Sequence, residues 1–511
     1  MKRILSLIMA VLLVVGLAAC GSSSDAKTAQ TTTKKKESAI QLAKIEDKYK
    51  GKFRVGFSRS DITPTDPTTP LSGYGNSPQR IATGYLSPLS TDATVVSDEK
   101  NNTVIIIQID IIGMYDSALA NNVFLYVSKK TGVPIDNIIF NMSHTHSAPD
   151  TGYTGMTSIS LYDQFLLNTV SENAVKAMND RFPSKMYYGE TETYHHNFVR
   201  HYWGDDGTGD VRAVGDNHWD IWYYDAPSPN KHYIDHIEEV DPTLYAVKFD
   251  REGADDVIIT SFRAHNTTTG GSTTYVISAD WVGKVRDCVE EKVGECHCMY
   301  LQGNAGNVNP SSRIEEENDM YKEKDYIQFA ETLEPYVETI LGNMTELKTG
   351  TVAGKRFAIT ANTCRDGTDK IAQATLVQSY WQKSNDSTQT KRYAYTLGIV
   401  SQYAASNYIS RAKRGATVEV YSSVIVIGEL ALTFAPGEMF SELGHQIIEK
   451  SPYKYTIPIS YSGHTIGYIP TDYAYEYGCY EVDITQIAKG TASQLIDEYA
   501  KQLAEIKKNT K

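Results

Sequence analysis

The chain has 511 residues, with 49 Lys and Arg against 62 Asp and Glu and a formal net charge of −13. Hydrophobic residues make up 41% and charged residues 22%, a composition that excludes a collagen-like chain, a disordered tail and a polytopic membrane protein. The excess of acids also argues against nucleic-acid binding, because nucleic-acid binders need a net basic surface to displace counterions from phosphate.

The N-terminal residues have the layout of a lipoprotein signal. Lys2 and Arg3 precede a short apolar run from Ile4 to Ala19, so residues 1–19 are predicted to be a signal peptide. The run ends at Cys20, which is followed by Gly as in a bacterial lipobox. We therefore expect Cys20 to carry a lipid that anchors the protein to the outer face of the cytoplasmic membrane, at the bacterial cell surface. An uncleaved single-pass anchor is the alternative.

Residues 20–51 are predicted to be a flexible tether, because they are rich in Ser, Thr, Ala, Gln and Lys and poor in core-forming side chains. The Lys excess of this segment suits a position beside anionic lipid, and a generic solvated spacer is the alternative. No segment rich in Pro, Gly or Ser divides the rest of the chain. Residues 52–511 are therefore predicted to form one large α/β domain, with a mixed β-sheet core and flanking helices.

Periodicity predicts the elements of this domain. Near-continuous apolar runs predict buried strands at 103–110, 137–142, 257–262 and 423–428. Helical patterns lie at 118–130, 162–180, 281–293, 325–341, 438–449 and 492–506. Residues 200–236 are long, aromatic and polar, which favours an ordered functional loop or lid.

The cysteines after Cys20 do not suggest a disulfide framework. They are five in number, at positions 288, 296, 298, 364 and 479, so they cannot all pair. Buried free thiols are the favoured interpretation. Cys296-His297-Cys298 could instead suggest a metal site, although no second Cys pair follows at zinc-finger spacing.

Polar residues follow two of the predicted strands and one further apolar run, 431–435. His144 and His146 leave the strand 137–142, and an i, i+2 spacing in extended backbone puts both imidazoles on one side. His265 follows the strand 257–262, and Glu438 follows an apolar run through Pro-Gly. Strand ends are where ligands bind in α/β sheets, and two His with one Glu would suit a catalytic zinc site. Each residue singly also fits a loop His or a Glu at a helix N-terminus.

A longer series of motifs runs through the domain. Its segments are 55–64, 80–89, 144–147, 241–249, 265–268, 277–280, 302–310, 436–438, 467–471 and 480–481. In this order, over more than 400 residues, the chain resembles the neutral (non-lysosomal) ceramidases, specifically their N-terminal catalytic domain.

The resemblance implies a zinc-dependent amidohydrolase acting on a ceramide-like lipid. The zinc ligands implied are His144, His265, Glu438 and Tyr468. The resemblance also places His146 beside the water that zinc activates, and Arg200 and Tyr480 against the amide carbonyl. Without the resemblance, Arg200 would be interpreted as part of a surface ion pair and Tyr480 as a packed aromatic residue.

Two departures from the family pattern affect the expected substrate. Asn309 stands where ceramidases carry a functional Ser, and an amide can orient a substrate but cannot act as a nucleophile. The C-terminal immunoglobulin-like domain of long ceramidases is also expected to be absent. With Asn at position 309, attack by water is still possible, whereas a mechanism that depends on the Ser is not.

Two further functions stay open at this point. An ester or lactone hydrolase could use the same zinc site. A non-catalytic ligand-binding lipoprotein is the alternative from a different class, since Trp203, Trp219, Trp222 and Tyr223 would suit stacking on sugars. In that case Asn309 would mark lost catalysis.

Overall fold

A computed structural model describes residues 40–66, 68–74, 80–152, 157–205, 211–215, 232–269, 275–311 and 326–509. The predicted signal peptide, Cys20 and residues 20–39 of the predicted tether lie outside the described residues. So do Trp219, Trp222 and Tyr223 of the predicted loop. Residues from Ile40 onward belong to one continuous unit.

The largest element is a nine-stranded mixed sheet. Its order is β14-β12-β11-β6-β1-β3-β4-β5, with β16 also paired to β6. The pairs β4–β5 and β12–β14 are parallel, and the others are antiparallel. The strands are β1 (Arg54–Asp61), β3 (Ser90–Ser97), β4 (Thr103–Ile109), β5 (Ile138–Met142), β6 (Phe182–Glu192), β11 (Thr243–Arg251), β12 (Asp256–Phe262), β14 (Cys296–Gln302) and β16 (Thr345–Leu347).

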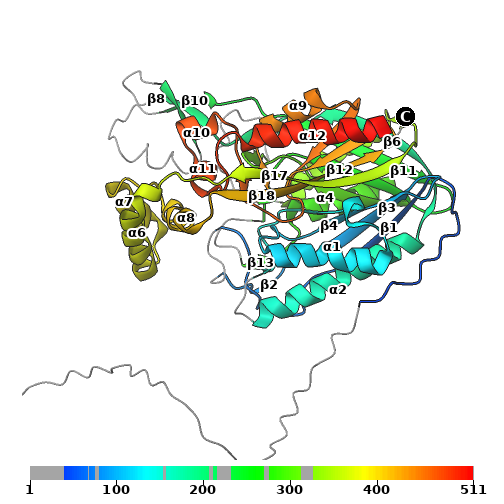
Figure 1. The fold of residues 1–511 in the computed structure, drawn as a ribbon, viewed down its shortest axis with the longest axis horizontal. Helices are drawn as coiled ribbons and strands as arrows, with labels where there is room; N and C mark the ends of the chain where they lie inside the picture. Colours follow the sequence, from blue (N-terminus) through cyan, green and yellow to red (C-terminus); the bar gives the residue numbers. More distant parts are fainter. Residues whose placement is uncertain are drawn as a thin grey trace, which may run out of the picture. The chain divides into compact units, whose positions relative to one another are not determined.

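Four helices pack against this sheet: α1 (Ser117–Thr131), α2 (Thr157–Asn179), α4 (Asp280–Val293) and α5 (Tyr326–Leu341). Helix α2 lies on β1 and β3 (Figure 1). Helix α4 packs on β14, and α5 packs on β6 and β11. Covered strands carry apolar residues on successive positions, which explains why β4 and β5 are almost entirely buried. The mixed-sheet fold with flanking helices is confirmed.

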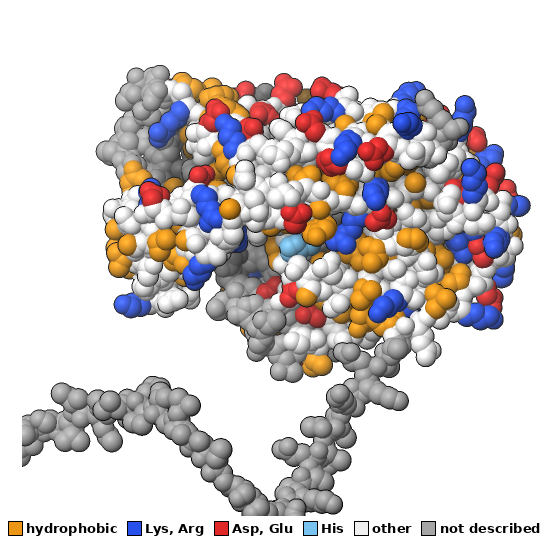
Figure 2. All heavy atoms as spheres, viewed as in Figure 1, with side chains coloured by type: hydrophobic (Ala, Val, Ile, Leu, Met, Phe, Trp, Pro, Cys, Tyr) orange, Lys and Arg blue, Asp and Glu red, His pale blue; other side chains and the backbone are white. Residues whose placement is uncertain are grey.

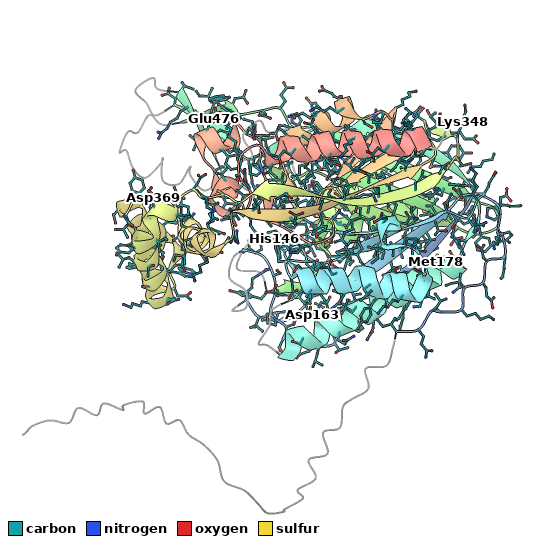
Figure 3. The ribbon with its side chains drawn as sticks, viewed as in Figure 1. His146, Asp163, Met178, Lys348, Asp369 and Glu476 are labelled. Carbon is teal, nitrogen blue, oxygen red and sulfur yellow. The ribbon has the colours of Figure 1, made fainter. Side chains whose placement is uncertain are left out.

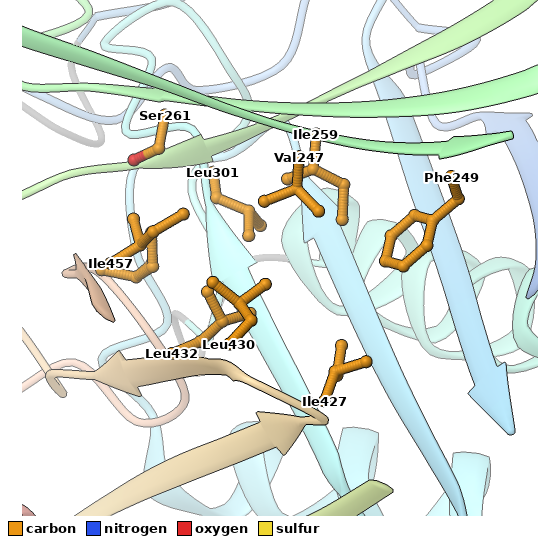
Figure 4. A pocket seen from close by; sticks show the side chains of 10 residues that line it. Val247, Phe249, Ile259, Ser261, Leu301, Ile427, Leu430, Leu432 and Ile457 are labelled. Atoms are coloured by element: carbon orange, nitrogen blue, oxygen red, sulfur yellow. The ribbon is translucent and has the colours of Figure 1, made fainter. Parts of the chain in front are cut away.

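A second, four-stranded sheet packs against the first. It has the order β17-β18-β19-β21, from strands Val352–Asn362, Thr417–Ile427, Leu430–Phe434 and Tyr455–Ile459. Helices α9 (Ser441–Lys450) and α12 (Thr491–Asn509) contact this sheet (Figure 1). Figure 4 shows Val247, Ile259 and Leu301 of the first sheet facing Ile427 and Leu432 of the second. The cavity left between them is about 10 Å³, hardly enough for one water, so this interface is packed core.

Smaller elements lie at the strand ends. They comprise β2 (Gly84–Tyr85) with β13 (Val276–Ile277), β7 (Asn197–Val199) with β15 (Val308–Pro310), β20 (Glu438–Met439) with β22 (Tyr468–Ile469), and the 3₁₀ turns Ile135–Asn137 and Thr368–Lys370. The short helices α10 (Ala474–Tyr477) and α11 (Tyr480–Ile484) follow β22. The described part of 200–236 forms a three-stranded sheet of β8 (Tyr202–Asp205), β9 (Val211–Val214) and β10 (His232–His236).

Three helices between β17 and β18 were not predicted. They are α6 (Ile371–Ser384), α7 (Ser387–Thr396) and α8 (Gln402–Lys413), and they form a separate group at one end of the molecule (Figure 1). Their sequence is mostly polar, and α6 buries only Ala374 and Val377. Such sparse apolar positions give little helical periodicity to detect.

Two predicted boundaries differ from the structure. Glu438 lies in β20 rather than at the start of a helix, because α9 begins only at Ser441. The domain also begins before residue 52: Ala43 donates its N–H to Lys130 O (2.8 Å), and Asp47 pairs with Arg54 (2.5 Å). Residues 43–51 therefore lie on the domain instead of continuing the tether.

Charges of both signs are interspersed on the face seen in Figure 2, with apolar side chains between them. Among the described residues, no helix is both long and apolar enough to cross a membrane.

Candidate active site

The ends of β5 and β12 meet near β20, and this brings together the polar residues that follow these strands. The side-chain nitrogens of His144, His146 and His265 lie within 4.8 Å of one another. His144 Nε2 is 3.3 Å from His146 Nε2. Glu438 Oε2 lies 3.2 Å from His144 Nε2 and 3.3 Å from His265 Nε2. Figure 3 shows His146 at this end of the strands, on the side of helices α6 and α8.

The two neighbouring histidines meet in a way that the sequence did not predict. His144 has φ 61°, in the left-handed region, so the backbone is not extended between the two residues. The His144 N–H donates to Ile111 O (3.0 Å), which turns the chain sharply as it leaves β5. The two rings stand nearly perpendicular, with centroids 4.9 Å apart. Gly73, at φ 95°, makes room for this arrangement, since a Cβ there would lie 2.8 Å from the His146 ring.

Hydrogen bonds to backbone carbonyls fix the tautomers of two histidines. His144 Nδ1 lies 2.6 Å from Ile112 O, and His265 Nδ1 lies 3.1 Å from Val308 O. Because a carbonyl oxygen only accepts, each Nδ1 carries the proton and each Nε2 presents a lone pair.

The resulting donor set fits a metal ion. His265 Nε2 and Glu438 Oε2 are buried, lie 3.3 Å apart, and have no hydrogen-bond partner within the described ranges. Two buried acceptors facing each other are unfavourable unless a cation or proton lies between them. Imidazole nitrogens with one carboxylate are ligands that zinc prefers.

Burial and nearby charge set the protonation states of these residues. Burial lowers the pKa of His146 well below its ordinary value, and His144 and His265 add to the effect. Burial and the charge of Arg200 lower the pKa of His265 to about 4. Burial raises the pKa of Glu438, but attraction to His144 and His265 outweighs it and holds the pKa below its usual range. At neutral pH the cluster therefore offers neutral imidazoles at His146 and His265 and an ionised carboxylate at Glu438.

Tyr468 reaches the site through strand pairing. β20 and β22 are parallel, with Glu438 opposite Tyr468 in the register, so both side chains lie on one face. A Cβ on Gly437 would clash with the backbone of Gly467, so this close approach requires glycine. Burial and the charge of Glu438 raise the pKa of Tyr468 well above its ordinary value.

Arg200 lies between β7 and β8 and points into the same region. Its Nη1 donates to Asn309 Oδ1 (3.3 Å), and its Nη2 donates to Gly306 O (2.9 Å) and Tyr468 Oη (3.3 Å). Its Nε donates to Glu481 Oε1 (2.8 Å). The residue is only 8% exposed, so the alternative interpretation as a surface ion pair was wrong.

Tyr480 is the first residue of α11, next to Tyr468. The two rings have centroids 5.8 Å apart and are tilted by 72°. Tyr403 of α8 packs on the other side of Tyr480, at 6.1 Å. The unpredicted helical group thus borders the site.

Several neighbours of the site were missed by the sequence analysis. Tyr461, with φ 52°, places its ring 4.2 Å from that of His144. Glu481 and His201 contact each other behind Arg200. Glu481 could have been predicted as a site residue, because it belongs to the family motif at 480–481. No sequence signal marks Tyr461.

The described cysteines are all free and buried, as predicted, at 288, 296, 298, 364 and 479. In β14, alternation puts Cys296 and Cys298 on one face and His297 on the other, so these three cannot bind one ion together. Burial raises the pKa of Cys296 to about 11, which further disfavours a thiolate ligand.

Comparison with known proteins identifies the family and finds structures of similar fold. The profile of the family "Neutral/alkaline non-lysosomal ceramidase, N-terminal" matches residues 53–313. Neutral ceramidase from Pseudomonas aeruginosa has a similar fold, with a TM-score of 0.66 at 15% identity, over 90% of this chain and 75% of that one. A ceramidase complexed with C2 gives a TM-score of 0.62 at 16% identity, over 90% and 76%. No curated protein matches the sequence. The family profile spans more than half of the chain, and the chain belongs to the neutral/alkaline non-lysosomal ceramidase family.

Proposed function

We propose that this protein is a zinc-dependent amidohydrolase that cleaves the amide bond of an N-acyl, ceramide-like lipid. Family membership supports a hydrolase of this class. The observation that carries the metal dependence is the pair of buried, unpartnered acceptors, His265 Nε2 and Glu438 Oε2, beside His144.

The proposed zinc ligands are His144, His265 and Glu438, with Tyr468 as the fourth. A bound zinc ion would polarise the carbonyl and lower the pKa of water toward about 7. Tyr468 is the least usual of these ligands, and its position opposite Glu438 in the strand register supports its inclusion.

The remaining site residues are proposed to stabilise the carbonyl oxygen, to transfer protons and to orient the substrate. Arg200 and Tyr480 would donate to the carbonyl oxygen as negative charge develops there, a contribution of roughly 3–4 kcal/mol per donor. His146, a neutral imidazole, would accept a proton from the attacking water and deliver it to the leaving amine. Asn309 Oδ1 accepts a hydrogen bond from Arg200, which supports a role for its amide in orienting the substrate rather than attacking it.

The first test measures metal content and turnover on the same sample. The full chain, purified in detergent, is analysed for bound metal and then assayed on a short-chain fluorescent ceramide and a matched ester, with and without chelator. We expect about one zinc per chain and chelator-sensitive cleavage of the amide. Faster cleavage of the ester would favour the ester or lactone hydrolase. Ligand binding with neither zinc nor turnover would favour the binding lipoprotein.

We also propose that a lipid on Cys20 holds the enzyme at the bacterial cell surface, where it would meet lipid substrates. The apolar run before Cys20 supports this localisation. The variant Cys20→Ala is expected to appear in the medium, because it lacks the acyl chains whose burial holds the protein on the membrane. Cell fractionation tests this, and quantitative retention of Cys20→Ala in the membrane fraction would contradict the lipid anchor.

A further inference from the structure

A second cluster of potential ligands lies behind Arg200. The side-chain atoms of His201, Cys479 and Glu481 lie within 4.8 Å of one another, and all three residues are buried. Unlike the first cluster, this one has its polar atoms engaged. His201 Nδ1 is 2.6 Å from Tyr477 Oη, and His201 Nε2 is 3.1 Å from Glu481 Oε2. The guanidinium of Arg200 already neutralises Glu481, so the cluster offers a metal cation no net negative charge.

We propose that Glu481 is the positioning residue of Arg200. Its Oε1 accepts hydrogen bonds from both Nε and Nη2 of Arg200. Nη1 is then directed at Asn309, and the other contacts of Nη2 are with Gly306 O and Tyr468 Oη. A guanidinium is planar, so hydrogen bonds from Nε and Nη2 to one carboxylate fix the orientation of the whole group. The remaining nitrogen, Nη1, then keeps a constant direction toward the site.

Burial explains why the partner must be an anion. Arg200 is 8% exposed, and a charge this buried is destabilising unless it is paired and hydrogen-bonded. Glu481 is 0% exposed, so it cannot contact the substrate and can act only through its neighbours. Burial raises the pKa of Glu481, but the charges of Arg200 and His201 outweigh it and keep the carboxylate ionised.

His201 and Tyr477 complete the support from behind. His201 holds the second oxygen of Glu481, and its carbonyl accepts from Ile237 N–H (2.9 Å). The anion is therefore tied on one side to α10 and on the other to the end of β10. The result is a chain of contacts from Tyr477 through His201 and Glu481 to Arg200.

A double-mutant cycle tests this inference, which rests on the proposed function. The variants are Glu481→Gln, Arg200→Gln and the pair, with kcat and KM measured on the short-chain ceramide and zinc content measured for each. Removal of an orienting partner typically lowers activity by about 10- to 100-fold. We expect Glu481→Gln to lower kcat by this amount when Arg200 is present, and by less than about twofold in the Arg200→Gln background. Zinc content should not change.

Two further variants keep the cycle interpretable. Glu476→Gln on α10 is the matched control, because Glu476 is exposed, pairs with Lys489 (2.8 Å) and lies on the outer surface (Figure 3). It should retain full activity. If Glu481→Gln does not fold, His201→Gln replaces it in the cycle, with a smaller loss that again requires Arg200. An equal loss of kcat in both backgrounds would overturn the proposal.

If the wild-type protein cleaves neither amide nor ester, the proposed function fails and the cycle is measured by binding. Dodecanoate, a carboxylate of the kind that amide hydrolysis releases, is titrated calorimetrically. Glu481→Gln should weaken its binding about tenfold when Arg200 is present and leave it unchanged in Arg200→Gln. Equal affinity in wild type and Glu481→Gln would overturn the role of Glu481.

Discussion

Replacing His265 with alanine is expected to remove the bound metal and to lower kcat/KM by more than about 100-fold, beyond the loss typical of an outer-shell partner. His265 Nε2 is buried, unprotonated and 3.3 Å from Glu438 Oε2. Among the described residues, the other imidazoles of this cluster are those of His144 and His146, so the substitution removes one of three. Metal analysis and steady-state kinetics on the same preparation measure both effects.

Two variants provide controls for this result. His297→Ala removes a half-exposed histidine that stacks on Phe57. Because His297 lies near the start of β14, at the end of the strand away from the site, zinc content and activity should stay unchanged. His146→Gln should keep the metal but lower kcat by about 10²- to 10⁴-fold, as expected when a proton-transfer group is lost. Retention of one zinc by His265→Ala would contradict the proposed metal centre. Loss of zinc from His146→Gln would instead make His146 a ligand.

The sequence contained enough to predict where the site lies. β4 and β5 were expected at 103–110 and 137–142 and are found at Thr103–Ile109 and Ile138–Met142. A strand that is covered on both faces of its sheet is apolar at nearly every position. Such continuous apolar runs can therefore be recognised in the sequence. Once the strands are placed, the polar residues after them must lie at strand ends, which is how His144 and His265 were selected.

The geometry at those ends could not be predicted, because contacts distant in sequence determine it. The backbone of His144 is in the left-handed region because its N–H donates to the carbonyl of Ile111, a residue that follows β4. Glu438 is in a strand because β22, thirty residues later, pairs with it. In both cases the local pattern favoured a different conformation, and tertiary hydrogen bonds overrode it.

The second large effect is expected for Asp280→Ala, which should lower the free energy of unfolding by about 4 kcal/mol or more. Asp280 is fully buried and accepts hydrogen bonds from the backbone and hydroxyl groups of Thr268 and Thr269 and from the N–H of Trp281. Its φ of 58° is also unfavourable for alanine. The substitution would leave several buried donors without an acceptor, each worth about 1–3 kcal/mol.

Asp280 also connects stability to the metal centre. Trp281, the next residue, donates Nε1–H to the carbonyl of His265 (3.0 Å). The carboxylate therefore fixes the segment from His265 to Thr269 against the start of α4. We expect Asp280→Ala to weaken zinc binding although it touches no proposed ligand.

Urea unfolding and zinc competition with a chelator measure the two effects separately. Asp280→Asn should lose less stability than alanine, because Asn keeps one acceptor oxygen and tolerates a positive φ. Asp497→Ala, which removes an exposed carboxylate paired with Lys450 (2.6 Å), should change neither quantity. Equal unfolding midpoints for Asp280→Ala and Asp497→Ala would show that the Thr268 and Thr269 donors find other acceptors. The buried carboxylate would then not be what holds His265 in place.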